Sequence, residues 1–110
     1  MGSKFWVNLI DMKITKEHII NSLKNDMNIL KNDLGVRELA LFGSYANNTQ
    51  REDSDIDFLL ELEQIDYNYL YKTYAFLEKK FPGKKIQILR RGPHLSETFL
   101  KSIEKDLIYV

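Results

Sequence analysis

The stretch LFGSYANNTQREDSDIDFLLEL, residues 41–62, joins two apolar segments through a polar loop and decides the fold. The first apolar segment, residues 39–42, predicts a buried strand that stops at Gly43, where a missing side chain lets the backbone turn close to a ligand. Ser44 then adds a hydroxyl and a backbone N–H at the expected start of a short helical turn, where unpaired N–H groups favour a phosphate. We therefore interpret Gly43 and Ser44 as a candidate nucleotide-binding turn.

Ten residues separate Ser44 from the first of two carboxylates, which lie in a predicted strand over residues 55–62. Asp55 and Asp57 are two positions apart, so both side chains point to the same face, about 6.6 Å apart along a strand. Ile56 and Phe58 would face the other way, into the core. Carboxylates at this spacing can hold one divalent cation, or two about 3.5–4 Å apart, against a transferring phosphoryl group. The pattern predicts a metal site for Mg²⁺ or Mn²⁺ at Asp55 and Asp57.

Other nucleotide and metal motifs do not fit this stretch. An EF-hand loop would need glycine where Phe58 stands and glutamate where Gln64 stands. No Gly-Lys-Ser/Thr follows Gly43, which excludes a P-loop, and the chain has no G-x-G-x-x-G. The informative feature of this stretch is therefore the combination of a strand, a Gly-Ser turn, a fixed gap and a D-x-D pair.

The combination resembles the minimal nucleotidyltransferase (MNT) family of the DNA polymerase beta-like superfamily. The signature of that family is G-S-x10-D-x-D, matched in register by Gly43-Ser44 and Asp55-Ile56-Asp57, and the resemblance extends over residues 14–110. It implies an α/β (α+β) fold with a small mixed β-sheet flanked by helices. It also implies that Gly43 and Ser44 hold the triphosphate of a nucleotide while Asp55 and Asp57 ligate magnesium.

Two positions depart from the family pattern. Asn48 replaces the usual second glycine, and asparagine tolerates positive φ better than most residues, so we expect the turn to persist. Gln87, in the predicted strand 85–89, stands where the family usually carries a third acidic residue that takes a proton from the attacking hydroxyl. Loss of a general base typically costs about 10²–10⁴ in rate. Gln87 is thus a candidate catalytic position whose amide would act weakly.

The resemblance implies the antitoxin of a toxin–antitoxin pair, which transfers AMP from ATP to a tyrosine hydroxyl of a HEPN-domain toxin. Two alternatives stay open. The domain could neutralise its partner by stoichiometric contact without turnover, which Gln87 favours. It could also modify a small hydroxylated molecule, although the chain has no second domain to build that pocket unless a homo-oligomer or partner completes it.

Composition limits the remaining classes. The chain has 110 residues, 44% of them hydrophobic, which predicts one globular domain. Sixteen acidic and sixteen basic residues give no net charge, so we expect no DNA partner and no attraction to anionic membranes. No cysteine is present and no apolar run approaches 18 residues, which favours a cytoplasmic protein. We assign residues 1–12 to an N-terminal extension and 13–110 to the MNT domain.

Apolar periodicity predicts the remaining elements. We expect an amphipathic helix over residues 16–33 with Thr15 as N-cap and Gly35 as its stop, a strand over 37–42, and a helix over 67–80 ended by Pro82-Gly83. A last helix follows from the apolar stripe at 95, 99, 103 and 107 and continues toward residue 110.

Two further groups of residues have both a structural and a functional interpretation. In the 67–80 helix, we expect Tyr71 and Tyr74 to lie in the core and Tyr69 at its rim. Alternatively, the tyrosines of this helix form a partner-binding face. Basic residues gather around the strand 85–89, and they are expected to be a solvated edge or, alternatively, to steer ATP or an acidic partner: Lys79, Lys80, Lys84, Lys85, Arg90 and Arg91.

Overall fold

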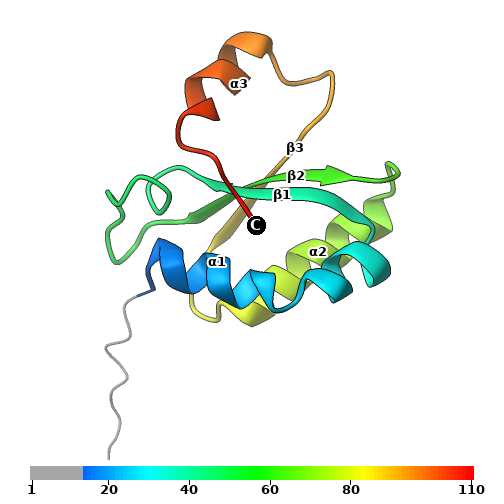
Figure 1. Cartoon of the computed structure of the whole chain (residues 1–110), viewed down its shortest axis with the longest axis horizontal. Helices are drawn as coiled ribbons and strands as arrows, with labels where there is room; N and C mark the ends of the chain where they lie inside the picture. Colours follow the sequence, from blue (N-terminus) through cyan, green and yellow to red (C-terminus); the bar gives the residue numbers. More distant parts are fainter. Residues whose placement is uncertain (1–13) are drawn as a thin grey trace, which may run out of the picture.

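The computed structural model describes residues 14–110, which form a mixed sheet with helices on both sides (Figure 1). In chain order the elements are α1 (Lys16–Lys24), a short π-helical turn η1 (Ile29–Asp33), β1 (Val36–Phe42), β2 (Ile56–Leu62), α2 (Tyr67–Lys80), β3 (Ile86–Arg90), α3 (Glu97–Glu104) and β4 (Ile108–Tyr109). This architecture confirms the expected α/β (α+β) class. The interpretation of residues 1–12 as an extension falls outside the described residues, and the boundary at residue 13 stays a prediction.

The sheet has four strands in the order β3-β2-β1-β4. β1 runs antiparallel to both β2 and β4, whereas β2 and β3 are parallel. The expected mixed sheet is therefore confirmed, but the helix expected to continue to residue 110 is wrong. Ile108 and Tyr109 pair with Leu41 and Ala40 of β1, and the N–H of Val110 donates to the carbonyl of Leu39 at 2.9 Å. Backbone pairing along the open edge of β1 outweighs the helical spacing of the last apolar residues.

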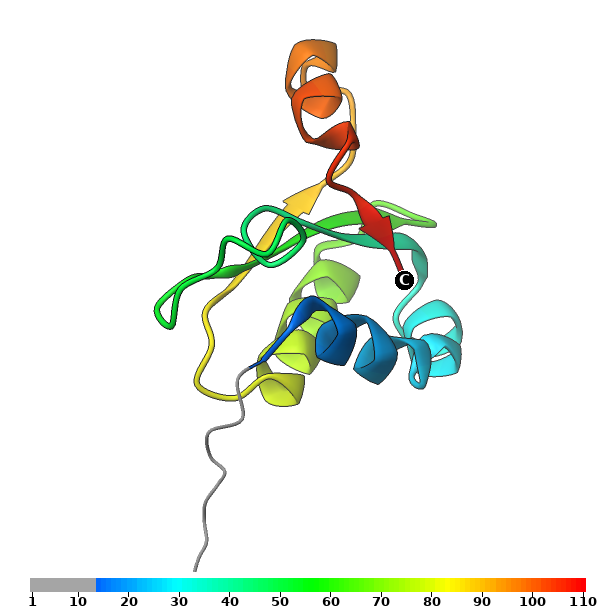
Figure 2. The ribbon, with the colours of Figure 1, turned by 60° about the vertical axis from the view of Figure 1, so that its left-hand side comes forward.

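The hydrophobic core lies between the sheet and the helix pair α1 and α2 (Figures 1 and 2). Alternate residues of β2 point into it, and Ile56, Phe58 and Leu60 are completely buried. The ring of Phe58 stacks at 6.5 Å on the ring of Phe81, which follows α2. Leu23 of α1 is also inaccessible to solvent, so one face of the sheet is sealed by helices.

The helix expected over residues 16–33 begins as predicted but is interrupted. The Thr15 hydroxyl accepts from the N–H of His18 at 3.1 Å, which confirms the N-cap. α1 ends at Lys24, with Asn25 as its C-cap. After one irregular turn the chain resumes as η1, where the N–H of Leu34 donates to the carbonyl of Ile29 at 3.1 Å. Asp26, at the break, forms an ion pair with Lys80 of α2. The apolar periodicity continues across the break, because α1 and η1 both turn their apolar residues toward the core.

α2 has the bounds that the sequence predicts. Asp66 caps it by accepting from the N–H of Asn68 at 2.8 Å, and the helix stops just before Phe81 and the Pro82-Gly83 turn. The tyrosine assignment is partly wrong, since Tyr71 is 71% exposed whereas Tyr74 packs against the edge of the core. α2 therefore buries a narrower stripe than its aromatic content suggests.

The opposite face of the sheet is far less covered. α3 stands over it, away from α1 and α2 (Figure 2), and contributes no buried residue. Only residues 97–104 of the expected last helix are helical, and Leu107 lies in the connection to β4. Within residues 14–110, no helix combines the length and the apolar character needed to cross a bilayer.

Candidate active site

The Gly-Ser turn begins where β1 ends. Gly43 has φ +75°, a left-handed conformation that disfavours any residue with a side chain, and its carbonyl accepts from the N–H groups of Ala46 and Asn47 at 3.1 and 3.2 Å. A Cβ on Gly43 would stand 2.3 Å from Oδ2 of Asp57. Glycine is thus required twice, by the backbone of the turn and by the carboxylate that lies against it.

Buried residues hold this turn in place. Tyr45 and Ala46 directly follow Ser44 and are 1% and 5% exposed, so the start of the loop belongs to the core. Lys84 Nζ lies 5.7 Å from the centre of the Tyr45 ring and donates to the carbonyl of Glu52 at 2.8 Å. From the sequence we interpreted Tyr45 only as part of the polar loop. An aromatic residue directly after Gly-Ser could have indicated that the loop is fixed to the core at this point.

Asn48 adopts the conformation expected of a glycine substitute. Its φ is +62°, and among the described residues it is the single non-glycine residue with positive φ. The N–H of Thr49 donates to the carbonyl of Ser44 at 2.9 Å, so the turn closes on itself. The expectation that asparagine preserves the turn is confirmed.

Asp55 and Asp57 meet at the start of β2, directly beside the Gly-Ser turn. β2 begins at Ile56, one residue later than expected, and Asp57 lies opposite Phe42, the last residue of β1. Burial raises the pKa of the Asp57 carboxyl above its ordinary value, and the neighbouring charge of Asp55 raises it further. A bound cation would offset the cost of keeping the Asp57 carboxylate ionised in this place.

Gln87 lies beside Asp57 in the sheet. The parallel register of β2 and β3 pairs Asp57 with Gln87, and the alternation that we expected holds, because Ile86 is buried on the helix side while Gln87 is exposed. The position expected to supply a third acidic group thus carries an amide next to the D-x-D carboxylates.

The donor set fits magnesium, although it is small. Within the described residues no cluster of three or more His, Cys, Asp or Glu side chains could hold a metal. Magnesium, however, is commonly bound by one or two carboxylates together with water and the phosphates of its substrate. Asp55 and Asp57 can supply the protein's share of such a site, and the nucleotide would have to supply the rest.

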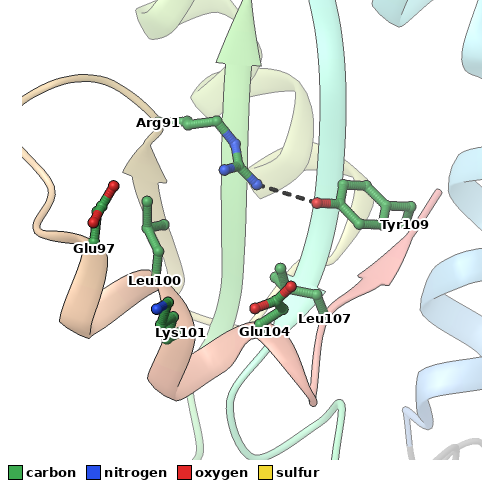
Figure 3. Close-up of a pocket in the computed structure, with 7 residues that line it drawn as sticks. All are labelled: Arg91, Glu97, Leu100, Lys101, Glu104, Leu107 and Tyr109. Carbon is green, nitrogen blue, oxygen red and sulfur yellow. Dashed lines mark hydrogen bonds between the residues drawn. The ribbon is translucent and has the colours of Figure 1, made fainter.

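A second polar group lies farther along the same face of the sheet. Glu61 of β2 shares this face with Asp57, and its carboxylate is 3.8 Å from Nε of Arg91 and 3.9 Å from the guanidinium of Arg37. The Arg91 guanidinium also donates to the Tyr109 hydroxyl at 3.1 Å (Figure 3). Sequence analysis missed this group, because Tyr109 and Arg91 meet only through the unexpected strand β4.

Three of the basic residues around β3 make contacts in separate places. Lys80 pairs with Asp26 on the helix side, whereas Lys84 binds the loop carbonyl of Glu52. Arg91 reaches over the opposite face toward Glu61. These separate contacts favour local structural roles over the alternative of one steering surface.

With this geometry in place, the relationship to known proteins can be stated. A family profile described as nucleotidyltransferase domain matches residues 23–110. The chain belongs to this family. It is similar to two Methanocaldococcus jannaschii proteins provisionally named protein adenylyltransferases, at 36% identity over 98 residues and 39% over 97, and each match covers 87% of this chain and 98% of the relative.

A further relative is the protein adenylyltransferase MntA of Thermococcus cleftensis, 27% identical over 97 residues, with 88% of this chain and 97% of the relative covered. Among solved structures, the chain is similar to one from a crystal structure of a mutant toxin–antitoxin complex, MntA–HpeT. That match has a TM-score of 0.55 and 16% identity, and it covers 87% of this chain and 72% of the other. Together with the family match and the relatives, it confirms the expected membership of the MNT family and its fold.

Proposed function

We propose that this protein transfers AMP from ATP to a hydroxyl group of a partner protein. The observation that carries the proposal is the contact between the Gly-Ser turn and the D-x-D pair, where a Cβ on Gly43 would collide with the Asp57 carboxylate. A turn able to hold phosphates and a pair of carboxylates able to hold a metal therefore share one small volume. The names of the relatives, protein adenylyltransferases, support the choice of ATP and of a protein acceptor.

In this reaction the acceptor oxygen bonds to the α-phosphorus, the bond from that phosphorus to the bridging oxygen breaks, and pyrophosphate leaves. Gly43 and Ser44 would position the distal phosphates, and Asp55 and Asp57 would hold Mg²⁺, or Mn²⁺ in its place. The metal would neutralise phosphate charge. Positioning and charge neutralisation supply most of the acceleration in phosphoryl transfer. Gln87 can hydrogen-bond the acceptor hydroxyl but cannot take its proton, which passes to water.

We propose that the acceptor is a tyrosine of a HEPN-domain toxin and that the protein is its antitoxin. The similarity of the fold to that of a toxin–antitoxin complex supports a toxin partner. An adenylyl group on a tyrosine of the toxin would neutralise it by adding bulk and negative charge.

Transfer of label from ATP tests this function. The full chain is incubated with Mg²⁺, the toxin encoded beside it, and ATP labelled either in the α- or in the γ-phosphate. We expect the toxin to gain label from the α-position alone, and Asp55→Asn to abolish the transfer. Absence of transfer by the wild type, together with equal toxin neutralisation by wild type and Asp55→Asn, would show that the protein does not act as an enzyme.

Gln87 favours a second candidate, in which the domain neutralises its partner by contact alone. A large exposed apolar surface at the start of α2 offers a docking face, since Ile65, Tyr67 and Tyr71 are each more than 70% exposed. The variant Gln87→Asp distinguishes the candidates. Activity in the variant alone would identify a degenerate enzyme, whereas activity in the wild type supports AMP transfer. Gln64→Asp, the same change at an exposed position just beyond the end of β2, is the matched control.

A further inference from the structure

A pocket of about 320 Å³ lies under α3, and the chemistry described so far does not use it (Figure 3). Arg91 and Tyr109 contribute to its sheet side. The other lining residues come from α3 and from the segment that follows it, and they are Glu97, Leu100, Lys101, Glu104 and Leu107. This volume lies at the lower end of the range for small-molecule sites.

The pocket opens on the face of the sheet that carries Asp57. Tyr109 is paired with Ala40 in β1, and Ala40 is paired with Leu59, which shares the Asp57 face of β2. Arg91 reaches the same face, because its guanidinium lies beside Glu61. Glu61 lies four positions beyond Asp57, about 13 Å along β2. A nucleoside attached to a phosphate at Asp57 can extend over that distance.

The lining of the pocket favours a neutral polar ligand over a phosphate. Two cations, Arg91 and Lys101, are balanced by two carboxylates, Glu97 and Glu104, so there is no excess positive charge to hold a polyanion. Carboxylates accept from amines and ribose hydroxyls, whereas guanidinium and ammonium groups donate to ring nitrogens. Tyr109 is 49% exposed, and its hydroxyl accepts a hydrogen bond from Arg91, which leaves the aromatic ring available for stacking.

We propose that this pocket is the nucleoside subsite of the proposed nucleotidyl transfer and that Tyr109 and Arg91 are its specificity-determining residues. The inference rests on the proposed function, because it needs the phosphates to bind at the Gly43-Ser44 turn. In the complex the base stacks on Tyr109, and Arg91 orients that ring through its hydroxyl. The α3 carboxylates accept from the sugar or from an exocyclic amine.

The test compares the affinity of the full chain for Mg-ATP with its affinity for Mg-tripolyphosphate, which has the phosphates but no nucleoside. Calorimetry is carried out on the wild type, Tyr109→Ala, Tyr109→Phe and Arg91→Gln. Removal of a stacking aromatic side chain weakens base binding on the order of tenfold. We expect Tyr109→Ala to bind ATP about tenfold more weakly and to bind tripolyphosphate as tightly as the wild type does. Tyr109→Phe and Arg91→Gln should both have intermediate ATP affinity, because each removes the hydrogen bond that orients the ring.

Ile29→Ala is the control, since Ile29 is an exposed apolar residue of η1, on the other side of the sheet, and its truncation should change neither affinity. Equal weakening of ATP and tripolyphosphate by Tyr109→Ala would overturn the inference, because the change would then be a general disturbance of the fold. Unchanged ATP affinity with a raised KM for the protein acceptor would also overturn it and assign the pocket to the acceptor. If the wild type binds neither ligand, the proposed function itself fails.

Discussion

The two faces of the central sheet differ in what covers them. On the helix side, Ile56, Phe58 and Leu60 of β2 are completely buried by α1, α2 and Phe81. On the other side, the same strand presents the half-buried Asp57 and Glu61, with the buried Leu59 between them. Arg91 contacts both Glu61 and Tyr109 over this face. A single strand therefore serves a packed core and an open polar face through its period-two alternation.

This difference separates stability from chemistry. The helix side buries a continuous apolar surface, which is the main source of folding free energy. The open side places a carboxylate with a raised pKa beside a second carboxylate and a left-handed glycine, an arrangement that costs stability and is typical of functional sites. Substitutions on the two faces should therefore differ in kind as well as in size.

The largest effect is expected from a matched pair of leucines in β2. Leu60 and Leu59 are neighbours and are 0% and 2% exposed, but they point to opposite faces. Leucine-to-alanine changes in cores cost about 2–5 kcal/mol, depending on how far the site can relax. We expect the loss of unfolding free energy to lie near the upper end of this range for Leu60→Ala and near the lower end for Leu59→Ala, as measured by urea denaturation. Equal losses would show that the open face is packed as firmly as the helix side.

A smaller loss of stability, with a complete loss of function, is expected at Gly43. Gly43→Ala forces a side chain into a left-handed conformation, at about 1–3 kcal/mol, and drives its Cβ against Asp57. Gly83→Ala is the control, because Gly83 also has positive φ but a Cβ there would meet no atom within 4 Å. Both variants should lose stability in denaturation experiments, and Gly43→Ala should lose more, because only its Cβ meets another side chain. Only Gly43→Ala should lose Mg-ATP binding, and retained binding would separate the turn from the site.

The smallest effect is expected at the N-cap of α1, on the helix side. Thr15→Ala removes the acceptor for the N–H of His18, which typically costs about 1 kcal/mol. Thr15→Ser, which keeps the hydroxyl, should stay near the wild type. Nucleotide affinity should not change in either variant, since the cap lies on the face opposite the carboxylates. A change in affinity would mean that the two faces are coupled more closely than we propose.

Local signals predicted much of this fold. Thr15, Pro82-Gly83 and the alternation around Asp57 each act within a few residues, so α2 and the main strands could be derived from spacing alone. The break of the first helix and strand β4 could not. Asp26 is stabilised by Lys80 from α2, and Tyr109 by pairing with β1, which are partners that no sequence window contains.

The candidate site divides in the same way. Gly43, Ser44, Asp55 and Asp57 lie within one stretch, and the strand register brings Gln87 to them as expected. The contact between Arg91 and Tyr109 escaped prediction because it spans the whole width of the sheet. Motif spacing thus locates the reaction centre, whereas the pocket beside it depends on the way the end of the chain returns to β1.

The most direct test of the account measures the stability of wild type and Asp57→Asn with and without Mg-ATP. Because burial and Asp55 raise the pKa of Asp57 in the folded state, the ionised carboxylate destabilises the fold at neutral pH. That penalty disappears as the pH falls below the ordinary carboxyl value of 3.8. Asp57→Asn should therefore be more stable than the wild type at pH 7, with an advantage that vanishes in acid.

Addition of Mg-ATP should reverse this order, raising the melting temperature of the wild type and leaving that of Asp57→Asn unchanged, since a ligand stabilises only the protein that binds it. Asn68→Asp, at an exposed position of α2, serves as the charge-changing control and should respond to Mg-ATP like the wild type. The account thus predicts that Asp57→Asn is the more stable protein without Mg-ATP and that the wild type is the more stable protein with it. An equal response of wild type and Asp57→Asn to Mg-ATP would contradict it.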